Sequence, residues 1–162
     1  ADAFGSRGIA LHHLNLEVTE SVLMETHIVR PIDNLRRLGV TVALDDFGTG
    51  YSNLSYLMDF NFKKLKIDRS FVQRLDSDES SGAVVSTIVG LSRALGAHTL
   101  AEGVETEQQA ILLRAAGCDA VQGFYYGKPA PLDYDRAAPG EPVPGKLKDL
   151  TVLPAQATAM VH

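Results

Sequence analysis

The sequence predicts an α/β protein whose strands form a parallel sheet. Short apolar stretches alternate with stretches of helical periodicity along most of the 162 residues. This alternation is typical of parallel sheets, because each helix carries the chain back to the start of the next strand. A second observation points the same way: a helix end, a glycine, a short strand and a polar residue recur in this order three times.

The repeated unit has a nearly constant spacing. Arginine stands three residues before glycine in each copy, and a polar residue follows that glycine by five or six positions (Arg36, Gly39, Asp45; Arg93, Gly96, Glu102; Arg114, Gly117, Gln122). Arginine near a helix end and a glycine stop are ordinary in α/β proteins. A polar residue at the end of every strand is not. Functional residues at the carboxyl ends of strands are typical of βα barrels and of open α/β sheets.

The first predicted strand follows His12 and His13. Apolar and polar residues alternate strictly over 14–19, which predicts a strand with one polar face that carries Glu17. A helix is expected next, with Pro31 in its first turn, where the missing N–H costs nothing. This helix should run to Leu38, and Gly39 should end it.

The stretch 40–52 joins an uncharged, strand-like run to two adjacent carboxylates, Asp45 and Asp46. Gly48 and Gly50 then allow a sharp turn. Neighbouring aspartates repel each other unless a cation or a proton lies between them, so they suit a hard divalent metal ion. An Asp-rich turn that caps a helix near Ser52 explains this stretch equally well.

The later elements are predicted from periodicity and capping residues. A short helix is expected over 54–58, and then a strand over 64–68 in which Lys66 and Asp68 share a face. Ser70 with Gln73, and Thr106 with Gln109, have the spacing of capping boxes that open helices. A longer helix is expected from about residue 83 to 96, and short strands over 99–101 and 120–123.

Composition limits the possible functions. The net charge of −5 leaves no basic surface for duplex nucleic acid. The single cysteine, Cys118, is expected in the core of a protein from a reducing compartment, and we expect a cytoplasmic location. No apolar run is long enough for this segment to insert into a membrane. The five histidines match no metal-ligand spacing and are expected to face solvent (His12, His13, His27, His98, His162).

The motifs are similar to those of a known family. Five stretches resemble, in order and spacing, the motifs of the EAL domain: 16–21, 45–52, 65–68, 101–106 and 122–124. The resemblance covers roughly residues 8–131. It implies a modified (β/α)8 barrel of the TIM type and a bacterial phosphodiesterase. Such an enzyme opens the second messenger cyclic di-GMP to linear pGpG with two Mg²⁺ or Mn²⁺ ions.

The resemblance also implies roles for individual residues. Glu17 and Asp45 would bind one metal ion, and Asp45, Asp46 and Glu102 would surround the second. Lys66 would lie beside the attacking water, and Gln122 would hold water or substrate. An older view of the family makes Glu102 the general base. Glu20 and Thr49 would support the loop over 47–52, and Glu105 would support the floor of the site.

Each role has a structural alternative. Glu20 and Glu105 stand where carboxylates commonly cap backbone N–H groups. Lys66 alone would suit the surface of a strand, and Gln122 alone would suit a buried amide. The aromatic run 124–126 could stack on a guanine, or it could pack in the core below the site.

Two family residues lie outside this sequence: the glutamate of the Glu-Ala-Leu signature and a metal-binding asparagine on the strand after it. We therefore expect an incomplete barrel of about five βα units over 1–132, followed by an irregular, proline-rich tail over 133–162. The chain would be a fragment of a larger signalling protein, with regulatory domains and possible tethering to a membrane. Otherwise a homodimer or another polypeptide would cover the open sheet edges. On its own the chain is expected to be weak or inactive. The alternative is a non-catalytic EAL domain that binds cyclic di-GMP or another protein.

Overall fold

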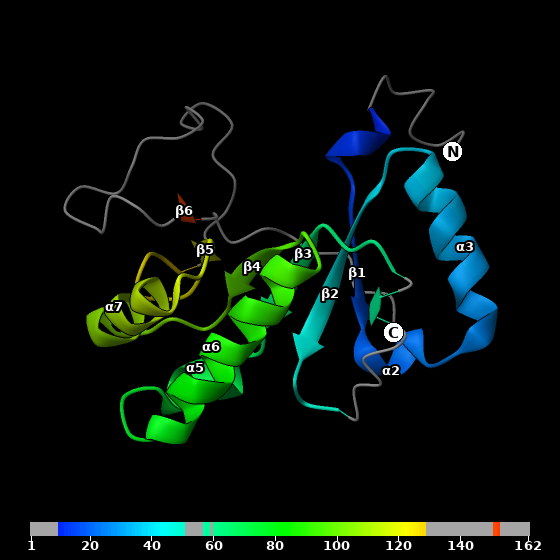
Figure 1. Cartoon of the computed structure of the whole chain (residues 1–162). Helices are drawn as coiled ribbons and strands as arrows, with labels where there is room; N and C mark the ends of the chain where they lie inside the picture. The colour runs from blue at the N-terminus through cyan, green and yellow to red at the C-terminus, as the bar shows by residue number, and fades with distance from the viewer. Residues whose placement is uncertain (1–9, 51–56, 59, 129–150, 153–162) are drawn as a thin grey trace, which may run out of the picture.

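One parallel sheet organises the computed structural model, which describes residues 10–50, 57–58, 60–128 and 151–152. Its strands are β1 (Asn15–Thr19), β2 (Thr41–Phe47), β3 (Lys64–Ile67), β4 (His98–Ala101), β5 (Ala120–Val121) and β6 (Thr151–Val152). They lie in the order of the chain, and every pairing is parallel (Figure 1). The predicted α/β fold with a parallel sheet is confirmed. All the strands therefore end at the same edge.

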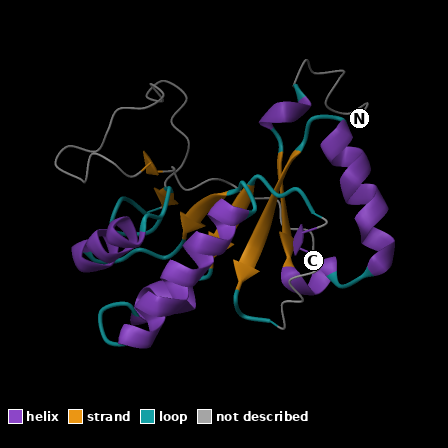
Figure 2. Ribbon diagram, in the orientation of Figure 1, coloured by secondary structure: helices purple, strands orange, loops and turns teal. Residues whose placement is uncertain are grey.

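Helices connect the strands and cover the sheet. They are the 3-10 helix η1 (Leu11–His13), α2 (Glu20–Leu23), α3 (Thr26–Arg37), α5 (Arg69–Arg74), α6 (Glu79–Ala94) and α7 (Glu107–Ala116). Helix α3 packs on β2 at one end of the sheet, while α6 packs on β3 and β4 and contacts both α5 and α7. Figure 2 shows this division, with α3 standing apart from the other long helices.

The core lies between the strands and these helices. Strands β2, β3 and β4 bury apolar side chains on both faces, including Leu44, Ile67 and Ala101, none of which has accessible surface. Val85 of α6 and Leu113 of α7 are equally buried. Full burial of one such aliphatic side chain stabilises the fold by about 1.5–3 kcal/mol. Cys118 is buried in this core as expected.

The N-termini of the helices show which predictions from local capping residues are correct. Thr106 and Gln109 form the predicted capping box of α7. The box predicted at Ser70 is wrong, because Asp68 caps α5 and its carboxylate accepts from Ser70 N at 2.9 Å. Helix α6 begins earlier than expected, since Asp78 caps it in the same way through Ser80 N.

Helix α3 is longer than expected at its start. It begins at Thr26, so Pro31 lies inside the helix and not in its first turn. Proline has no N–H to donate to the carbonyl of His27, which such a helix would otherwise use. Ile28 and Ile32 pack against the core, and this burial stabilises the turn in spite of the lost bond.

Two predicted segments fall mainly outside the described residues. Of the helix expected over 54–58, only residues 57 and 58 are described, and both are helical. The tail was expected to be irregular, but Thr151 and Val152 form β6 on the edge of β5. Both residues are β-branched, which favours a strand. The rest of the tail and the division at residue 132 lie outside the described residues.

Candidate functional site

Lys66 is the centre of a buried charge cluster. Its Nζ lies 2.7 Å from Glu17 Oε2, 2.9 Å from Asp45 Oδ1 and 2.8 Å from Glu102 Oε1. The side chain of Lys66 is 5% exposed and that of Asp45 is 3% exposed. One ammonium group thus faces three carboxylates in a region that water hardly reaches.

The sheet brings these four residues together from four neighbouring strands. Glu17 lies on β1, Asp45 on β2 and Lys66 on β3, while Glu102 directly follows β4. The register pairs Thr19 with Asp45 and Ile67 with Ala101, so all four side chains stand near the carboxyl edge. Neighbouring strands are about 4.8 Å apart, and long side chains can therefore meet across them.

Asp46 reaches the same edge through an irregularity in β2. Neighbouring residues on a regular strand point to opposite faces. The register of β2 against β3 shifts between Leu44 and Phe47, and the backbone of Asp46 is left-handed with φ 52°. A bulge of this kind turns a side chain toward the strand end. Asp46 N also donates to Asp45 Oδ1 at 3.0 Å, which holds the two residues together.

The charge cluster contains more negative than positive groups, and the pKa values of its members reflect this. Burial raises the pKa of the Asp46 carboxyl, and the negative charge of Asp45 raises it further. Burial likewise raises the pKa of Glu102, although Lys66 opposes this through a hydrogen bond. Burial alone would lower the pKa of Lys66, but hydrogen bonds to Glu102, Glu17 and Asp45 outweigh it and raise this pKa above its ordinary value.

The donor set fits a hard divalent cation. Three carboxylates, those of Glu17, Asp45 and Glu102, meet one ammonium group, and Asp46 directly follows Asp45. Oxygen ligands are those that Mg²⁺, Mn²⁺ and Ca²⁺ prefer. Within the described ranges, no three histidine, cysteine or carboxylate side chains are already arranged around a common point for a metal ion. Lys66 Nζ occupies the centre of the carboxylates, so ligation would require this ammonium to move aside.

Gln122 extends the cluster from β5. It follows Val121, and its Nε2 donates to Glu102 Oε1 at 2.7 Å, the same oxygen that Lys66 contacts. Gln122 N donates to Ala101 O at 2.9 Å, so the backbone is fixed directly beside Glu102. Two donors on one carboxylate oxygen hold the Glu102 side chain in a defined orientation.

The turn after β2 is held by Glu20 and Thr49. Glu20 Oε1 accepts from Gly48 N at 2.6 Å, and Thr49 Oγ1 donates to Asp46 O at 2.8 Å. Glu20 Oε2 is buried and has no hydrogen-bond partner among the described residues. A β-carbon at Gly50 would lie only 2.8 Å from this oxygen, so the turn passes tightly over Glu20.

Glu105 lies away from the charge cluster. Its side chain is exposed, and Gln73 Nε2 of α5 donates to Glu105 Oε1 at 3.4 Å. Glu105 N donates to Gln109 Oε1 at 2.8 Å, as part of the start of α7. The sequence suggested a capping box for Gln73 and gave no sign of its contact with Glu105, because an exposed helical glutamine does not reveal its neighbours in space before the fold is known.

The aromatic run divides between surface and core. Phe124 is 59% exposed, whereas Tyr125 and Tyr126 are partly buried against the core. The rings of Tyr125 and Tyr126 meet edge to face at 5.0 Å. Phe124 is therefore the exposed ring of the three, with Lys128 Nζ 5.8 Å from its centroid, while the tyrosines pack.

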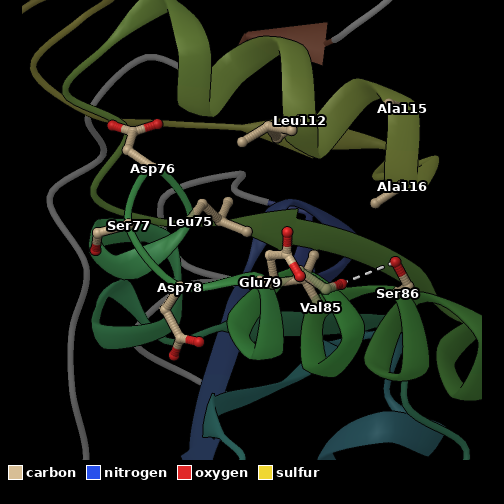
Figure 3. A pocket seen from close by; sticks show the side chains of 11 residues that line it. Leu75, Asp76, Ser77, Asp78, Glu79, Val85, Ser86, Leu112, Ala115 and Ala116 are labelled. Atoms are coloured by element: carbon tan, nitrogen blue, oxygen red, sulfur yellow. Dashed lines mark hydrogen bonds between the residues drawn. The ribbon is translucent and has the colours of Figure 1, made fainter.

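The hollows at the surface do not coincide with the cluster. A pocket of about 550 Å³ lies between the start of α6 and α7 (Figure 3). It is lined by Leu75, Asp76, Ser77, Asp78, Glu79, Gly82, Val85, Ser86, Leu112, Ala115 and Ala116. None of these residues belongs to the charge cluster. We place the chemistry at the cluster, because buried opposite charges are a stronger sign of function than a hollow alone.

None of the helices in the described ranges is both long enough and apolar enough to cross a membrane.

Comparisons with known proteins place the chain in a family. The model of the EAL domain matches residues 1–129. The bifunctional diguanylate cyclase/cyclic di-GMP phosphodiesterase MucR of Pseudomonas aeruginosa is 46% identical over 123 residues, which are 75% of this chain and 18% of MucR. The cyclic di-GMP phosphodiesterase RocR of the same organism is 41% identical over 125 residues, 73% of this chain and 32% of RocR.

Solved structures agree with this match. The MucR phosphodiesterase in complex with cyclic di-GMP superposes with a TM-score of 0.76 at 42% identity, over 82% of this chain and 55% of the other. A manganese and cyclic di-GMP complex of BlrP1 from Klebsiella pneumoniae gives a TM-score of 0.73 at 32% identity, over 79% of this chain and 33% of the other. This chain therefore spans a minor part of its curated relatives, and it belongs to the EAL domain family.

Proposed function

We propose that the parent protein containing this chain hydrolyses cyclic di-GMP to linear pGpG. The observation that carries the proposal is the convergence of Glu17, Asp45 and Glu102 on Lys66 at the carboxyl edge of the sheet. Relatives named cyclic di-GMP phosphodiesterases support it, as do solved relatives that hold cyclic di-GMP. In the reaction, the oxygen of water forms a bond to phosphorus, the bond from phosphorus to the ribose 3′ oxygen breaks, and that oxygen takes up a proton.

Divalent cations are proposed as cofactors. Glu17 and Asp45 would hold one ion, and Asp45, Asp46 and Glu102 would hold a second. When bound, two such ions lower the pKa of water and stabilise charge on the phosphoryl group. Complexes of a relative with manganese or with calcium support divalent ions in general, and we propose Mg²⁺ or Mn²⁺ for this chain.

The chain's own residues have distinct roles in this proposal. Lys66 supplies a positive charge beside the attacked phosphate, where it stabilises the charge that develops on the phosphoryl oxygens. Glu102 can accept the proton of the water, and the raised pKa of this carboxyl makes it a better base than an exposed glutamate. Gln122 orients Glu102 through the bond to Oε1. Glu20 and Thr49 keep the turn after Asp46 in place.

Replacing Asp45 with asparagine in the parent protein tests the proposal. Asparagine keeps the size of the side chain but removes the charge that both ions would share. Hydrolysis of cyclic di-GMP with Mn²⁺, followed as pGpG by chromatography, should fall at least about a hundredfold. Lys63→Met, which changes an exposed residue near β3, serves as the control and should keep the normal rate. A normal rate in the Asp45→Asn variant would refute the proposal.

Regulatory domains in the parent protein are proposed as partners, since the curated relatives are much longer than this chain. The competing function is a receptor that binds cyclic di-GMP without cleaving it. Calorimetry on the parent protein distinguishes the two, because a receptor would bind the dinucleotide and yield no pGpG.

A further inference from the structure

We propose that helix α5 positions both halves of the metal site: Phe71 supports the turn that follows Asp46, and Arg69, through its β-carbon, supports the turn that follows Glu102. This inference rests on the proposed function, because it concerns how that site keeps its shape. The residues of α5 are far from both turns along the sequence, and no motif in the chain identifies them as part of the site.

The first contact fixes the turn after β2. A β-carbon at Gly48 would lie 2.9 Å from Phe71 Cε2 and 3.6 Å from Ile88 Cδ1, so this backbone lies directly on the Phe71 ring. Gly48 has φ +96°, a conformation that other residues rarely adopt. Its N–H is bound by Glu20 at 2.6 Å. The turn is therefore held between a carboxylate and an aromatic ring.

The ring of Phe71 is itself held in place. The guanidinium carbon of Arg74 lies 5.6 Å from the ring centroid. Arg74 Nε donates to Ser70 O at 3.0 Å, which keeps the guanidinium close to the helix. Phe71 thus cannot move far without losing contacts on two sides. Because the ring is fixed, it restricts where the turn packed against it can lie.

The second contact fixes the turn after β4. Gly103 directly follows Glu102, has φ +73°, and would place a β-carbon 2.7 Å from Arg69 Cβ. Two hydrogen bonds continue this contact. Gln73 Nε2 donates to Glu105 Oε1 at 3.4 Å, and Thr106 Oγ1 donates to Asp76 Oδ2 at 3.1 Å. Figure 3 shows Asp76 on the turn after α5, beside the segment that leads to α7.

Topology explains why one helix can serve both turns. Helix α5 follows β3 with only Asp68 between them, and β3 lies between β2 and β4 in the sheet. The start of α5 therefore stands above the central strand, within reach of the turn on each side. A shift of this helix would displace Asp46 and Glu102 together. Metal ligands lose affinity when the residues that orient them are removed, typically about 10–100-fold.

Phe71→Ala and Val72→Ala, made in the parent protein, separate positioning from simple stability. Val72 is the next residue on α5 and is fully buried in the core, so its truncation removes packing without touching either turn. Phe71→Ala should accelerate hydrogen exchange at the Gly48 amide and weaken Mn²⁺ binding about 10–100-fold. Val72→Ala should lower the melting temperature and leave Mn²⁺ affinity unchanged. Phe71→Leu, which keeps part of the contact, should recover much of the affinity.

A pair of glycine variants tests the second turn. Gly103→Ala, at φ +73°, forces a β-carbon against Arg69 and should weaken Mn²⁺ binding, whereas Gly96→Ala carries similar backbone strain at φ +69° with no atom within 4 Å of the added β-carbon and should not. The proposal is overturned if Phe71→Ala and Val72→Ala change exchange at Gly48 equally, or if Gly103→Ala binds Mn²⁺ normally. A parent protein that binds no Mn²⁺ would refute the proposed function instead, and exchange at Gly48 would still decide the role of Phe71.

Discussion

At the scale of single residues, Lys66 dominates the energetics of the site. Its ammonium group is surrounded by three carboxylates and is almost completely buried. Such a group neutralises part of the cluster's charge when no cation is bound. The same residue would face the phosphate during hydrolysis. Lys66 thus has a structural role in the charge cluster, and the proposed function gives it a chemical role as well.

Replacing Lys66 with methionine should destabilise the metal-free protein by about 3–5 kcal/mol at pH 8, because three buried carboxylates lose their counter-charge. Urea unfolding at pH 8 measures this loss of stability. Added Mn²⁺ should reduce the difference in unfolding free energy between the variant and the wild type. Lys63→Met, an exposed change in the same segment, should alter stability by no more than about 0.5 kcal/mol. Equal effects of the two variants would contradict the assigned role of Lys66.

Motifs in the sequence identify candidate residues that lie near the carboxyl ends of strands. Glu17, Asp45, Lys66, Glu102 and Gln122 come from five motifs, and hydrogen bonds and ion pairs join their side chains in the structure, while their functional roles stay a prediction. Glu105 is different, because its exposed side chain contacts Gln73 and lies outside the charge cluster. A motif identifies a residue type and a position along the chain. It does not reveal which neighbour an exposed side chain will meet after folding.

At the scale of secondary structure, the internal proline of α3 removes one backbone hydrogen bond from the helix and so destabilises it locally. Pro31 is exposed, so its side chain contributes little packing to offset the missing hydrogen bond. The expected start of α3 was wrong because a proline suits a first turn better than a helix interior. Burial of Ile28 and Ile32 on the core decided the outcome instead. Tertiary packing routinely overrides a local preference of this size.

Pro31→Ala should therefore stabilise the protein by up to about 3 kcal/mol, since alanine restores the N–H donor and removes the clash with the preceding turn. Urea denaturation would show the gain as a higher midpoint with an unchanged slope. Asn34→Ala, another exposed change in α3, controls for helix propensity and should give less than about 0.7 kcal/mol. A loss of stability in Pro31→Ala would mean that the helix requires the bend that proline introduces.

The connection between β4 and β5 contains a pH-dependent contact at the opposite edge from the site. Thr99 N and Thr99 Oγ1 donate to Asp119 Oδ2 at 2.7 and 2.8 Å. Burial would raise the pKa of Asp119, but these hydrogen bonds outweigh it, with help from His98 and Arg93, and lower the pKa below its ordinary value. A lowered pKa means that the ionised carboxylate stabilises the folded state.

Asp119→Ala should lower the free energy of unfolding by about 1–3 kcal/mol at pH 7, because it leaves the buried N–H and hydroxyl of Thr99 unpaired. The part that comes from ionisation is fully present above the unfolded pKa of about 4 and disappears as the pH falls through the lower folded value. Unfolding at pH 7 and at pH 2.5 tests this. A difference between variant and wild type that is larger at pH 2.5 would contradict it.

At the scale of the whole molecule, the chain carries one side of a family barrel. The parallel sheet was predictable because each strand and helix has its own local signal, and the repeated spacing of arginine, glycine and a polar residue gave the order of the units. The bulge at Asp46 was not, because it depends on how strands β2 and β3 pair, which periodicity along the chain does not encode. The cap at Asp68 was missed for a different reason: Ser70, two residues later, is also a good capping residue type.

The chain alone should hydrolyse cyclic di-GMP at least about a hundredfold more slowly than an intact EAL barrel, since it covers only 55% of the solved MucR phosphodiesterase. Initial rates of pGpG formation with saturating Mn²⁺ measure this. The appropriate reference is an intact family member at the same active-site concentration. Comparable rates would show that the residues in this chain suffice for catalysis. Light scattering on the same sample would reveal whether two copies pair their open edges.

The strictly sequential order of the strands has a consequence for folding. Each strand pairs with the one synthesised just before it, from β1 to β5, so no strand has to wait for a distant partner. A nascent chain can therefore add one strand and one helix at a time as it leaves the ribosome, with short loops to close at every step. The cluster around Lys66 would form late in this process. Its last carboxylate arrives only when Glu102 has been made and β4 has docked.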